Sequence, residues 1–183
     1  DLCKQYEFNG NMYPVAWVGD CVFTNSIKLQ NVKASDALVT IGESAFQNCR
    51  ALSDFDLSHV QEIGRRAFKN CDLLEEIDLS NAKEIGEEAF QNCSRLHVNA
   101  INGSVGRAAF RRLNLKDIDY IAETPLISDA AFQDCKLLKT FRIKGTFANN
   151  LGKSAFEGCE ALARIEVPAS VKTIERASFV RCA

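Results

Sequence analysis

Cysteine is the residue type in this chain best suited to chemistry, because its eight cysteines could form disulfides or bind a metal. Six of them, however, share one position, three residues after a phenylalanine: Cys49, Cys71, Cys93, Cys135, Cys159 and Cys182. Leu113 takes the same position after Phe110. A position that accepts Cys or Leu is an apolar packing position, since a free cysteine behaves as a small hydrophobic side chain. We therefore predict a buried ladder of free thiols.

Few other residues are candidates for catalysis, metal binding or disulfide formation. Cys3 and Cys21 lie apart from the six and could form a disulfide, while the absence of a C-x-x-C pair leaves a structural zinc site without a local nucleus. His59 and His97 occupy different positions relative to the phenylalanines, which favours surface roles. The run 152–154, Gly-Lys-Ser, resembles the end of a phosphate-binding loop, but that loop's first glycine is replaced by Phe147. We expect no catalytic residue, no cofactor and no metal.

These cysteines follow a six-residue phrase that recurs seven times. The phrase begins with an aliphatic residue, which is usually followed by glycine. Two variable residues come next, then usually alanine, and finally phenylalanine. It is clearest at 41–46, 63–68 and 85–90 and more degenerate later, and its phenylalanines are Phe46, Phe68, Phe90, Phe110, Phe132, Phe156 and Phe179. Self-similarity with a period of about 20 to 50 residues predicts a solenoid. The Gly-Lys-Ser triplet is part of one copy, so packing explains it.

A second block follows each cysteine position, with the spacing L-x-x-I-x-L, as at 52–57, 74–79, 138–143 and 162–167. Its alternation predicts a strand. The segment from the glycine to the cysteine lacks that alternation and suits a short helical turn. Each repeat is thus predicted as strand, turn, short helix and turn. A single repeat cannot bury both its Leu/Ile row and its Phe, so that stacked repeats are needed to form the core.

The combined pattern, L-x-x-I-x-L followed after about five residues by I-G-x-x-A-F-x-x-C, resembles the BspA-like leucine-rich repeats, also called the Treponema pallidum type. This resemblance implies an α/β solenoid that is curved and right-handed, with a parallel β-sheet on its concave face and short helices or turns on its convex side. The match weakens at 94–103 and at Ser128 and Glu175, which replace glycine. There we expect the stacking to bend or break.

Two segments are predicted: an N-terminal cap at 1–37 and a solenoid of about seven repeats, each of 20–24 residues, at 38–183. Within the first, 6–13 reads as a β-hairpin, because Asn9-Gly10 favours a tight turn. The 22 basic and 24 acidic residues leave a formal charge of −2, which excludes a nucleic-acid-binding footprint. The sequence has no apolar run long enough to insert in a membrane.

Counting from each phenylalanine identifies the outward positions of the predicted strands. An acidic series passes into a more basic one: Asp54, Asp56, Glu76, Asp78, Asn99, Asp117, Asp119, Thr140, Arg142, Arg164 and Glu166. Like charges opposite one another in a sheet are unfavourable by up to about 1 kcal/mol a pair. The acidic row is therefore either a docking surface for a basic partner or cations, or a hydrated face that discourages aggregation.

A solenoid acts through an extended surface, which predicts a non-enzymatic module that binds a protein partner through its sheet. The resemblance implies a secreted or cell-surface location and an adhesion role, with an extracellular-matrix or host surface protein as partner. One alternative is a structural or spacer segment of a larger surface protein whose activity lies in other domains. A second alternative is an enzyme or carbohydrate-active domain, although the sequence has no G-x-S-x-G motif.

Overall fold

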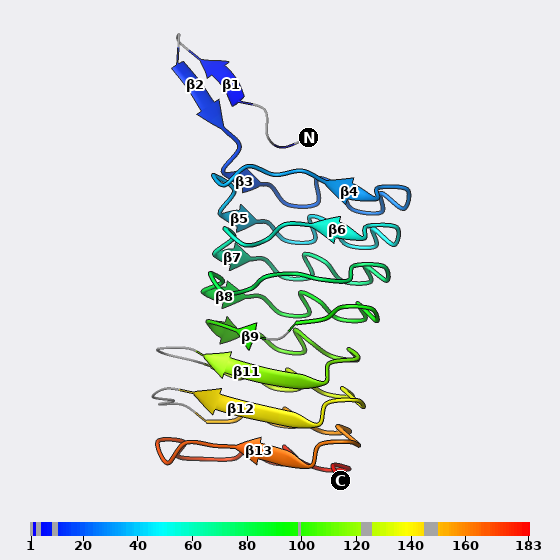
Figure 1. The fold of residues 1–183 in the computed structure, drawn as a ribbon, viewed down its shortest axis with the longest axis vertical. Helices are drawn as coiled ribbons and strands as arrows, with labels where there is room; N and C mark the ends of the chain where they lie inside the picture. Colours follow the sequence, from blue (N-terminus) through cyan, green and yellow to red (C-terminus); the bar gives the residue numbers. More distant parts are fainter. Residues whose placement is uncertain (1, 3–4, 9–10, 99, 122–125, 145–149) are drawn as a thin grey trace.

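The computed structural model describes residues 1–183 with the exception of 1, 3–4, 9–10, 99, 122–125 and 145–149. The described residues form a stack of coils, a parallel β-solenoid, with an N-terminal hairpin that projects from one end (Figure 1). The strands are β1 (Gln5–Phe8), β2 (Asn11–Pro14), β3 (Trp17–Val18), β4 (Asn31–Val32), β5 (Thr40–Ile41), β6 (Asp54–Phe55), β7 (Glu62–Ile63), β8 (Glu84–Ile85), β9 (Ala100–Ile101), β10 (Ser104–Val105), β11 (Asp117–Ile121), β12 (Thr140–Lys144) and β13 (Arg164–Glu166).

The segments predicted as strands from L-x-x-I-x-L lie along one side of the stack, which we call the strand face. The strand predicted at 74–79 is wrong in extent, because only Glu76 forms a bridge there. The strand face consists of the pair β4–β6, an isolated bridge between Glu76 and His97, and the sheet β9–β11–β12–β13. The side chains of β11 and β12 alternate between buried and outward positions, so that Ile118, Tyr120 and Phe141 point into the core. The parallel strands of the predicted solenoid are therefore confirmed.

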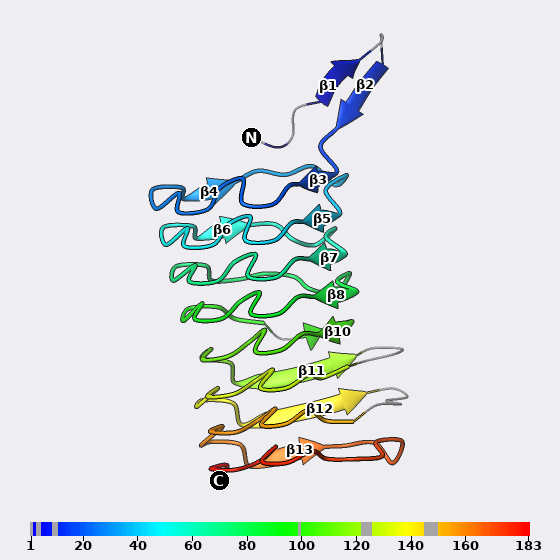
Figure 2. The same ribbon diagram turned by 180° about the vertical axis from the view of Figure 1, so that it is seen from behind.

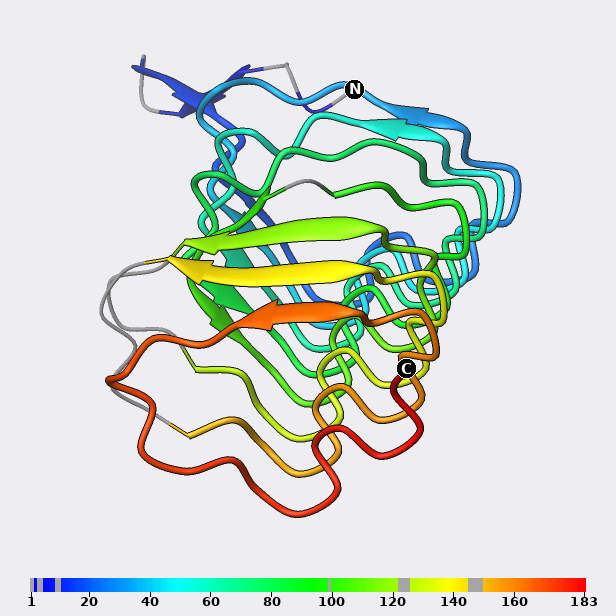
Figure 3. The ribbon, with the colours of Figure 1, turned by 60° about the horizontal axis from the view of Figure 1, so that its bottom comes forward.

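A second parallel ladder, which was not predicted, runs through the aliphatic residue of the recurring phrase. We call it the isoleucine–glycine ladder. It joins β3, β5, β7, β8 and β10 in one column (Figure 2) and continues as single bridges from Val105 to Ile127, Leu151 and Ile174. Each coil thus has two β segments, and successive coils lie over one another when viewed partly along the stack (Figure 3).

The predicted short helices are wrong, since the described residues contain no helix and the segment after each glycine is a run of tight turns. Ser44 and Asn48 have positive φ angles of 53° and 62°. The N–H groups of Ser44, Phe46 and Asn48 each donate to a carbonyl of the next coil, at 2.8 Å. The N–H groups between them close turns within the coil, as Gln47 does onto Ser44 at 3.1 Å. In an α-helix, each N–H after the first turn would instead bond to the carbonyl four residues earlier in the same segment.

The N-terminal hairpin is confirmed in its strands, because β1 and β2 pair antiparallel, while its turn residues Asn9 and Gly10 lie outside the described residues. Residues 17–32 form a further coil, although we had predicted no repeat there. Val18-Gly19 pairs onto the isoleucine–glycine ladder, and Phe23 stacks on Phe46 at 5.0 Å. Val18 to Phe23 is thus an eighth, degenerate copy of the phrase. The division at residue 37 between cap and solenoid stays a prediction.

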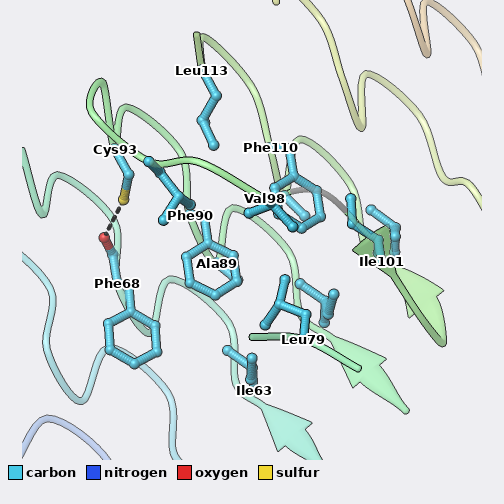
Figure 4. Packing of buried hydrophobic residues seen from close by; sticks show 14 of the residues in the cluster. Ile63, Phe68, Leu79, Ala89, Phe90, Cys93, Val98, Ile101, Phe110 and Leu113 are labelled. Atoms are coloured by element: carbon cyan, nitrogen blue, oxygen red, sulfur yellow. Dashed lines mark hydrogen bonds between the residues drawn. The ribbon is translucent and has the colours of Figure 1, made fainter. Parts of the chain in front are cut away.

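The core is a column of stacked phenylalanines that runs the length of the solenoid (Figure 4 shows part of it). Neighbouring rings lie 5.0 to 5.5 Å apart with planes within 15° of parallel: Phe23, Phe46, Phe68, Phe90, Phe110, Phe132, Phe156 and Phe179. Offset-stacked rings add about 0.5–1.5 kcal/mol a pair to the burial of their area. The phrase therefore contributes chiefly to packing.

The thiol ladder is confirmed: Cys49, Cys71, Cys93, Cys135 and Cys159 are free and buried, and Cys182 is half-buried at the last coil. Each thiol donates to the carbonyl oxygen of the phenylalanine one coil earlier, as Cys93 Sγ does to Phe68 at 3.0 Å (Figure 4). Leu113 cannot make this bond, yet it packs in the same place. Cys21 is an exposed free thiol, and its candidate partner Cys3 lies outside the described residues.

We expect the buried thiols to resist alkylation in the native protein. Burial raises the pKa of Cys93 to about 12, so that few thiolates, the reactive form, exist at mildly alkaline pH. Peptide mapping after iodoacetamide treatment is expected to show rapid modification of Cys21 and modification of Cys71, Cys93 and Cys135 only when urea unfolds the chain. Equal labelling of Cys93 and Cys21 in the native state would contradict the ladder.

The departures from the glycine consensus do not break the stack. Gly42, Gly64, Gly86 and Gly106 each donate an N–H to the preceding coil at 2.7 Å. Ser128 and Glu175 donate in the same way at 3.0 Å. Gly152 makes the equivalent bond at 3.0 Å as well. The expectation of a break at Ser128 and Glu175 is therefore wrong, because the hydrogen bonds between coils continue there.

Candidate functional site

The first half of the strand face gathers four of the candidate side chains. Asp54, Asp56, Glu76 and Asp78 are exposed, and together with His97 they line a hollow of about 300 Å³. They come from two successive coils at the same repeat positions, which places like charges side by side along the stack. The structure therefore brings this acidic group together, as the spacing predicted.

Short-range bonds orient two of these carboxylates without neutralising them. Asp56 Oδ1 accepts the backbone N–H of Ser58 at 2.9 Å, and Asp78 Oδ1 accepts that of Ser80 at 2.8 Å. The Ser58 N–H is the main reason why the pKa of Asp56 lies below its usual value. Among the described residues, no Lys or Arg forms an ion pair with any of the four. This acidic hollow is left uncompensated.

The second half of the strand face is different, because its charges pair with one another. Asp119 Oδ1 lies 2.6 Å from Arg142 Nε, and Asp119 Oδ2 lies 2.6 Å from Lys144 Nζ. These bonds lower the pKa of Asp119, and the bond from Lys144 has the largest effect. Arg164 pairs with Glu166 at 2.7 Å.

The remaining candidates of this half add one carboxylate without an ion pair among the described residues. It belongs to Asp117, which accepts the hydroxyl of Thr140, directly opposite it in the parallel register. Asn99 lies outside the described residues. Lys144 was not among the predicted residues, although the alternation of β12 places it on the same side as Thr140 and Arg142. The predicted basic end is thus a paired and nearly neutral surface.

A second surface was missed altogether, because it lies on the isoleucine–glycine ladder. A groove of about 530 Å³ runs along this ladder and contains Trp17, Glu62 and Glu84. The available signal was the residue before each aliphatic position of the phrase, which is Thr40, Glu62, Glu84 and then Ser104. It was missed because those residues were expected in the turn between the predicted strand and the predicted short helix.

Metal ligation and thiol chemistry find few suitable groups in the described part of the chain. No group of three or more His, Cys, Asp or Glu side chains there could hold a metal ion. The thiols of the ladder are buried, and burial raises their pKa, as at Cys135 to about 12. No helix within the described ranges is long and apolar enough to cross a membrane.

Comparison with solved structures shows the fold. The chain is similar to a leucine-rich repeat protein of T. pallidum, with 24% identity, a TM-score of 0.56, and coverage of 91% of this chain and 69% of the other. A leucine-rich cell surface protein of Faecalibacterium prausnitzii matches with 17% identity over 97% of this chain and 83% of the other, at a TM-score of 0.36. A search of the curated proteins gives no significant match.

The family model described as the BspA type leucine-rich repeat region matches with six copies, over residues 12–105 and 81–183. Those ranges contain both β ladders, the phenylalanine column and the thiol ladder. They also begin before the coil at 17–32, in agreement with its stacking on the rest. The chain belongs to the BspA-type leucine-rich repeat family.

Proposed function

We propose that the protein is a non-enzymatic binding module, secreted or displayed at a cell surface, which docks a protein partner on the strand face. The observation that carries this proposal is the acidic hollow, where Asp54, Asp56, Glu76 and Asp78 share one exposed surface without a compensating cation among the described residues. A basic patch on the partner supplies the missing charge.

The energetics favour a binding role for this surface. Like charges stacked along a sheet cost up to about 1 kcal/mol a pair, and a partner that brings lysines or arginines relieves this repulsion. A surface of one sign also attracts the partner over distances near the Debye length, about 8 Å at physiological salt. The paired second half, around Asp119 and Arg142, would supply hydrogen bonds and contact area rather than net charge.

The location and the adhesion role rest on family membership. The resemblance to BspA-like proteins implies a cell-surface protein that binds components of the extracellular matrix, so that a matrix or host surface protein is the proposed partner. Protein recognition by stacked repeats uses a long continuous surface, and the coils here provide one.

The proposal is tested by reversing charge at two residues of the acidic hollow. The Asp54→Lys/Glu76→Lys variant is expected to bind the tightest ligand of a panel of immobilised extracellular-matrix proteins at least about tenfold more weakly than the unmodified protein does, a loss of about 1.4 kcal/mol. Biolayer interferometry at low and high salt would measure it, and binding by the unmodified protein is expected to weaken with salt.

The matched control is Glu62→Lys/Glu84→Lys, which makes the same change in charge at exposed positions of successive coils on the other ladder. This variant is expected to keep its affinity for the matrix protein. Equal losses in both variants would show a nonspecific charge effect, and an unchanged affinity in the Asp54/Glu76 variant would remove the acidic hollow from the interface.

A further inference from the structure

The groove on the isoleucine–glycine ladder is a surface that the proposed function does not use. It is formed by β3, β5, β7, β8 and β10, which lie in one column (Figure 2), and extends from Trp17 to Ser128. We call it the ladder groove. Its floor is the aliphatic and glycine backbone of the recurring phrase. A second hollow of about 660 Å³ shares Leu126 and Ser128 with it and continues it toward Glu175.

One wall of the ladder groove carries hydrogen-bonding groups in register along the stack. Thr40 lies opposite Glu62, Glu62 opposite Glu84, and Glu84 opposite Ser104. Glu62 Oε2 accepts the Thr40 hydroxyl at 3.5 Å. Within the described residues, neither Glu62 nor Glu84 has a Lys or Arg at ion-pair distance. Two carboxylates and two hydroxyls are therefore available to a ligand on this wall.

Apart from the two glutamates, the charged residues of the ladder groove are Asp20 and Arg65. Arg65 lies 3.3 Å from Glu43 and 3.9 Å from Glu87, which stand beside the groove. Asp20 Oδ1 accepts the backbone N–H of Glu43 at 2.7 Å. The described lining thus offers no unpaired cation, so that it would not select a polyanion.

Trp17 stands at one end of the ladder groove with 62% of its surface exposed. It belongs to β3 and lies opposite Thr40, in line with the carboxylate wall. An exposed indole beside an apolar floor is a surface feature that marks binding sites, because its ring offers a large flat area for stacking.

We propose that the ladder groove binds a linear, neutral, β-1,4-linked glycan. A sugar ring stacks on Trp17, the apolar C–H faces of the following sugars lie on the ladder floor, and their hydroxyls donate to Glu62 and Glu84. Carboxylates accept two hydroxyl hydrogen bonds each, and charge-assisted bonds of this kind are the strong ones. Thr40 and Ser104 both donate and accept, which suits a polyhydroxylated chain.

The spacing of the coils favours a glycan over an extended peptide. Strands in a ladder lie about 4.8 Å apart, while an extended peptide advances about 3.3 Å per residue. One sugar of a β-1,4-linked chain advances along its axis by about the coil spacing, so that each sugar meets an equivalent coil. A peptide along the stack drifts out of register, and it cannot pair with β5, β7 or β8, because each of these strands is already hydrogen-bonded to a strand on both sides.

Trp17 is the single tryptophan of the chain, so its fluorescence reports directly on the ladder groove. Titration with cellohexaose or with the hexamer of β-1,4-linked N-acetylglucosamine is expected to give a saturable change in emission with at least one of them. The corresponding disaccharide is expected to bind about tenfold more weakly, because it covers fewer coils.

Variants locate the binding. Glu62→Gln/Glu84→Gln keeps the fluorescent reporter and is expected to lower the affinity for the hexasaccharide about tenfold or more. Trp17→Ala, followed by isothermal titration calorimetry, is expected to show a similar loss. The control, Asp54→Asn/Glu76→Gln, alters the strand face by the same charge and is expected to bind the hexasaccharide unchanged. Circular dichroism confirms that each variant is folded.

Three results would overturn the glycan assignment. The first is the absence of saturable binding by either hexasaccharide, and the second is equal affinity in the Glu62/Glu84 variant and the control. The third is a preference for a decalysine peptide that depends on Glu62 and Glu84, which would identify a basic ligand for the groove instead. None of these results depends on the matrix-protein experiment, because the two surfaces share no tested residue.

Discussion

Replacement of Phe68 by alanine is expected to lower the free energy of unfolding by about 3–5 kcal/mol, the range for a buried phenylalanine. Phe68 is fully buried, and its ring stacks on Phe46 and on Phe90, at 5.3 Å in each case. The substitution removes the contacts on both sides and leaves a cavity that the hydrogen-bonded coils cannot close. Urea unfolding followed by circular dichroism measures the loss.

The control for this variant is Phe179→Ala at the C-terminal end of the column. Phe179 is half-buried and stacks on one ring, Phe156, at 5.5 Å. Its replacement is expected to cost less than half as much as that of Phe68. Equal costs would mean that the stacked neighbours do not determine the contribution of a ring, contrary to the packing described.

Replacement of Gly64 by alanine is expected to destabilise the protein by about 1–3 kcal/mol, the usual cost of overpacking. A Cβ atom at residue 64 would lie 2.6 Å from the backbone carbon of Gly42 and 2.7 Å from the nitrogen of Glu43. These atoms belong to the adjacent coil and cannot rotate away, so that the two coils must separate. A lower urea midpoint with an unchanged m-value is the expected result.

Gly19 provides a matched control, because it holds the same position of the phrase in the coil at 17–32. A Cβ atom there would lie 3.6 Å from Val22 Cγ2, an ordinary contact. Gly19→Ala is therefore expected to be neutral or to stabilise by about 0.4–1 kcal/mol through the unfolded state. A destabilisation as large as that of Gly64→Ala would show that helix or strand propensity, rather than close approach, governs this position.

The sequence predicted the parts of the fold that repeat with strong apolar side chains. The period, the buried phenylalanine column and the thiol ladder all follow from Phe46 and its equivalents and from the cysteine three residues later. The strand at L-x-x-I-x-L was predictable because five or six residues suffice to show alternation. Stacking was predictable because one coil cannot bury its own core.

The turn geometry was only partly predictable from residue types. The positive φ two residues after the phenylalanine falls on residues that favour it, such as Asn48, Asn70 and Asn92. The positive φ two residues before the phenylalanine falls on Ser44, Arg66, Glu88 and Ala130, which do not favour it. The G-x-x-A-F-x-x-C spacing also matches the three- and four-residue spacing of a helix face. Hydrogen bonds to the next coil decide between a helix and a run of tight turns, and the sequence of a single repeat contains no information on those bonds.

The candidate site likewise has a part that the sequence predicted and a part that it did not. Asp54 and Glu76 were correctly placed on one exposed face, because counting from each phenylalanine fixes their positions. The pairing of Asp119 with Arg142 and Lys144 depends on which rotamers meet across strands, which spacing alone does not determine. The ladder groove was missed because two-residue strands such as β5 and β7 are too short to show any alternation.

The two ladders also differ in mechanical continuity. Within the described residues, the bridge of Glu76 with His97 is the pairing between β6 and β9 on the strand face, whereas β7, β8 and β10 pair without interruption on the other side. We therefore expect the stack to bend most easily at this level, with the isoleucine–glycine ladder as its axis. A partner that spans both halves of the strand face would then meet a surface of adjustable curvature, while the ladder groove would keep a constant length.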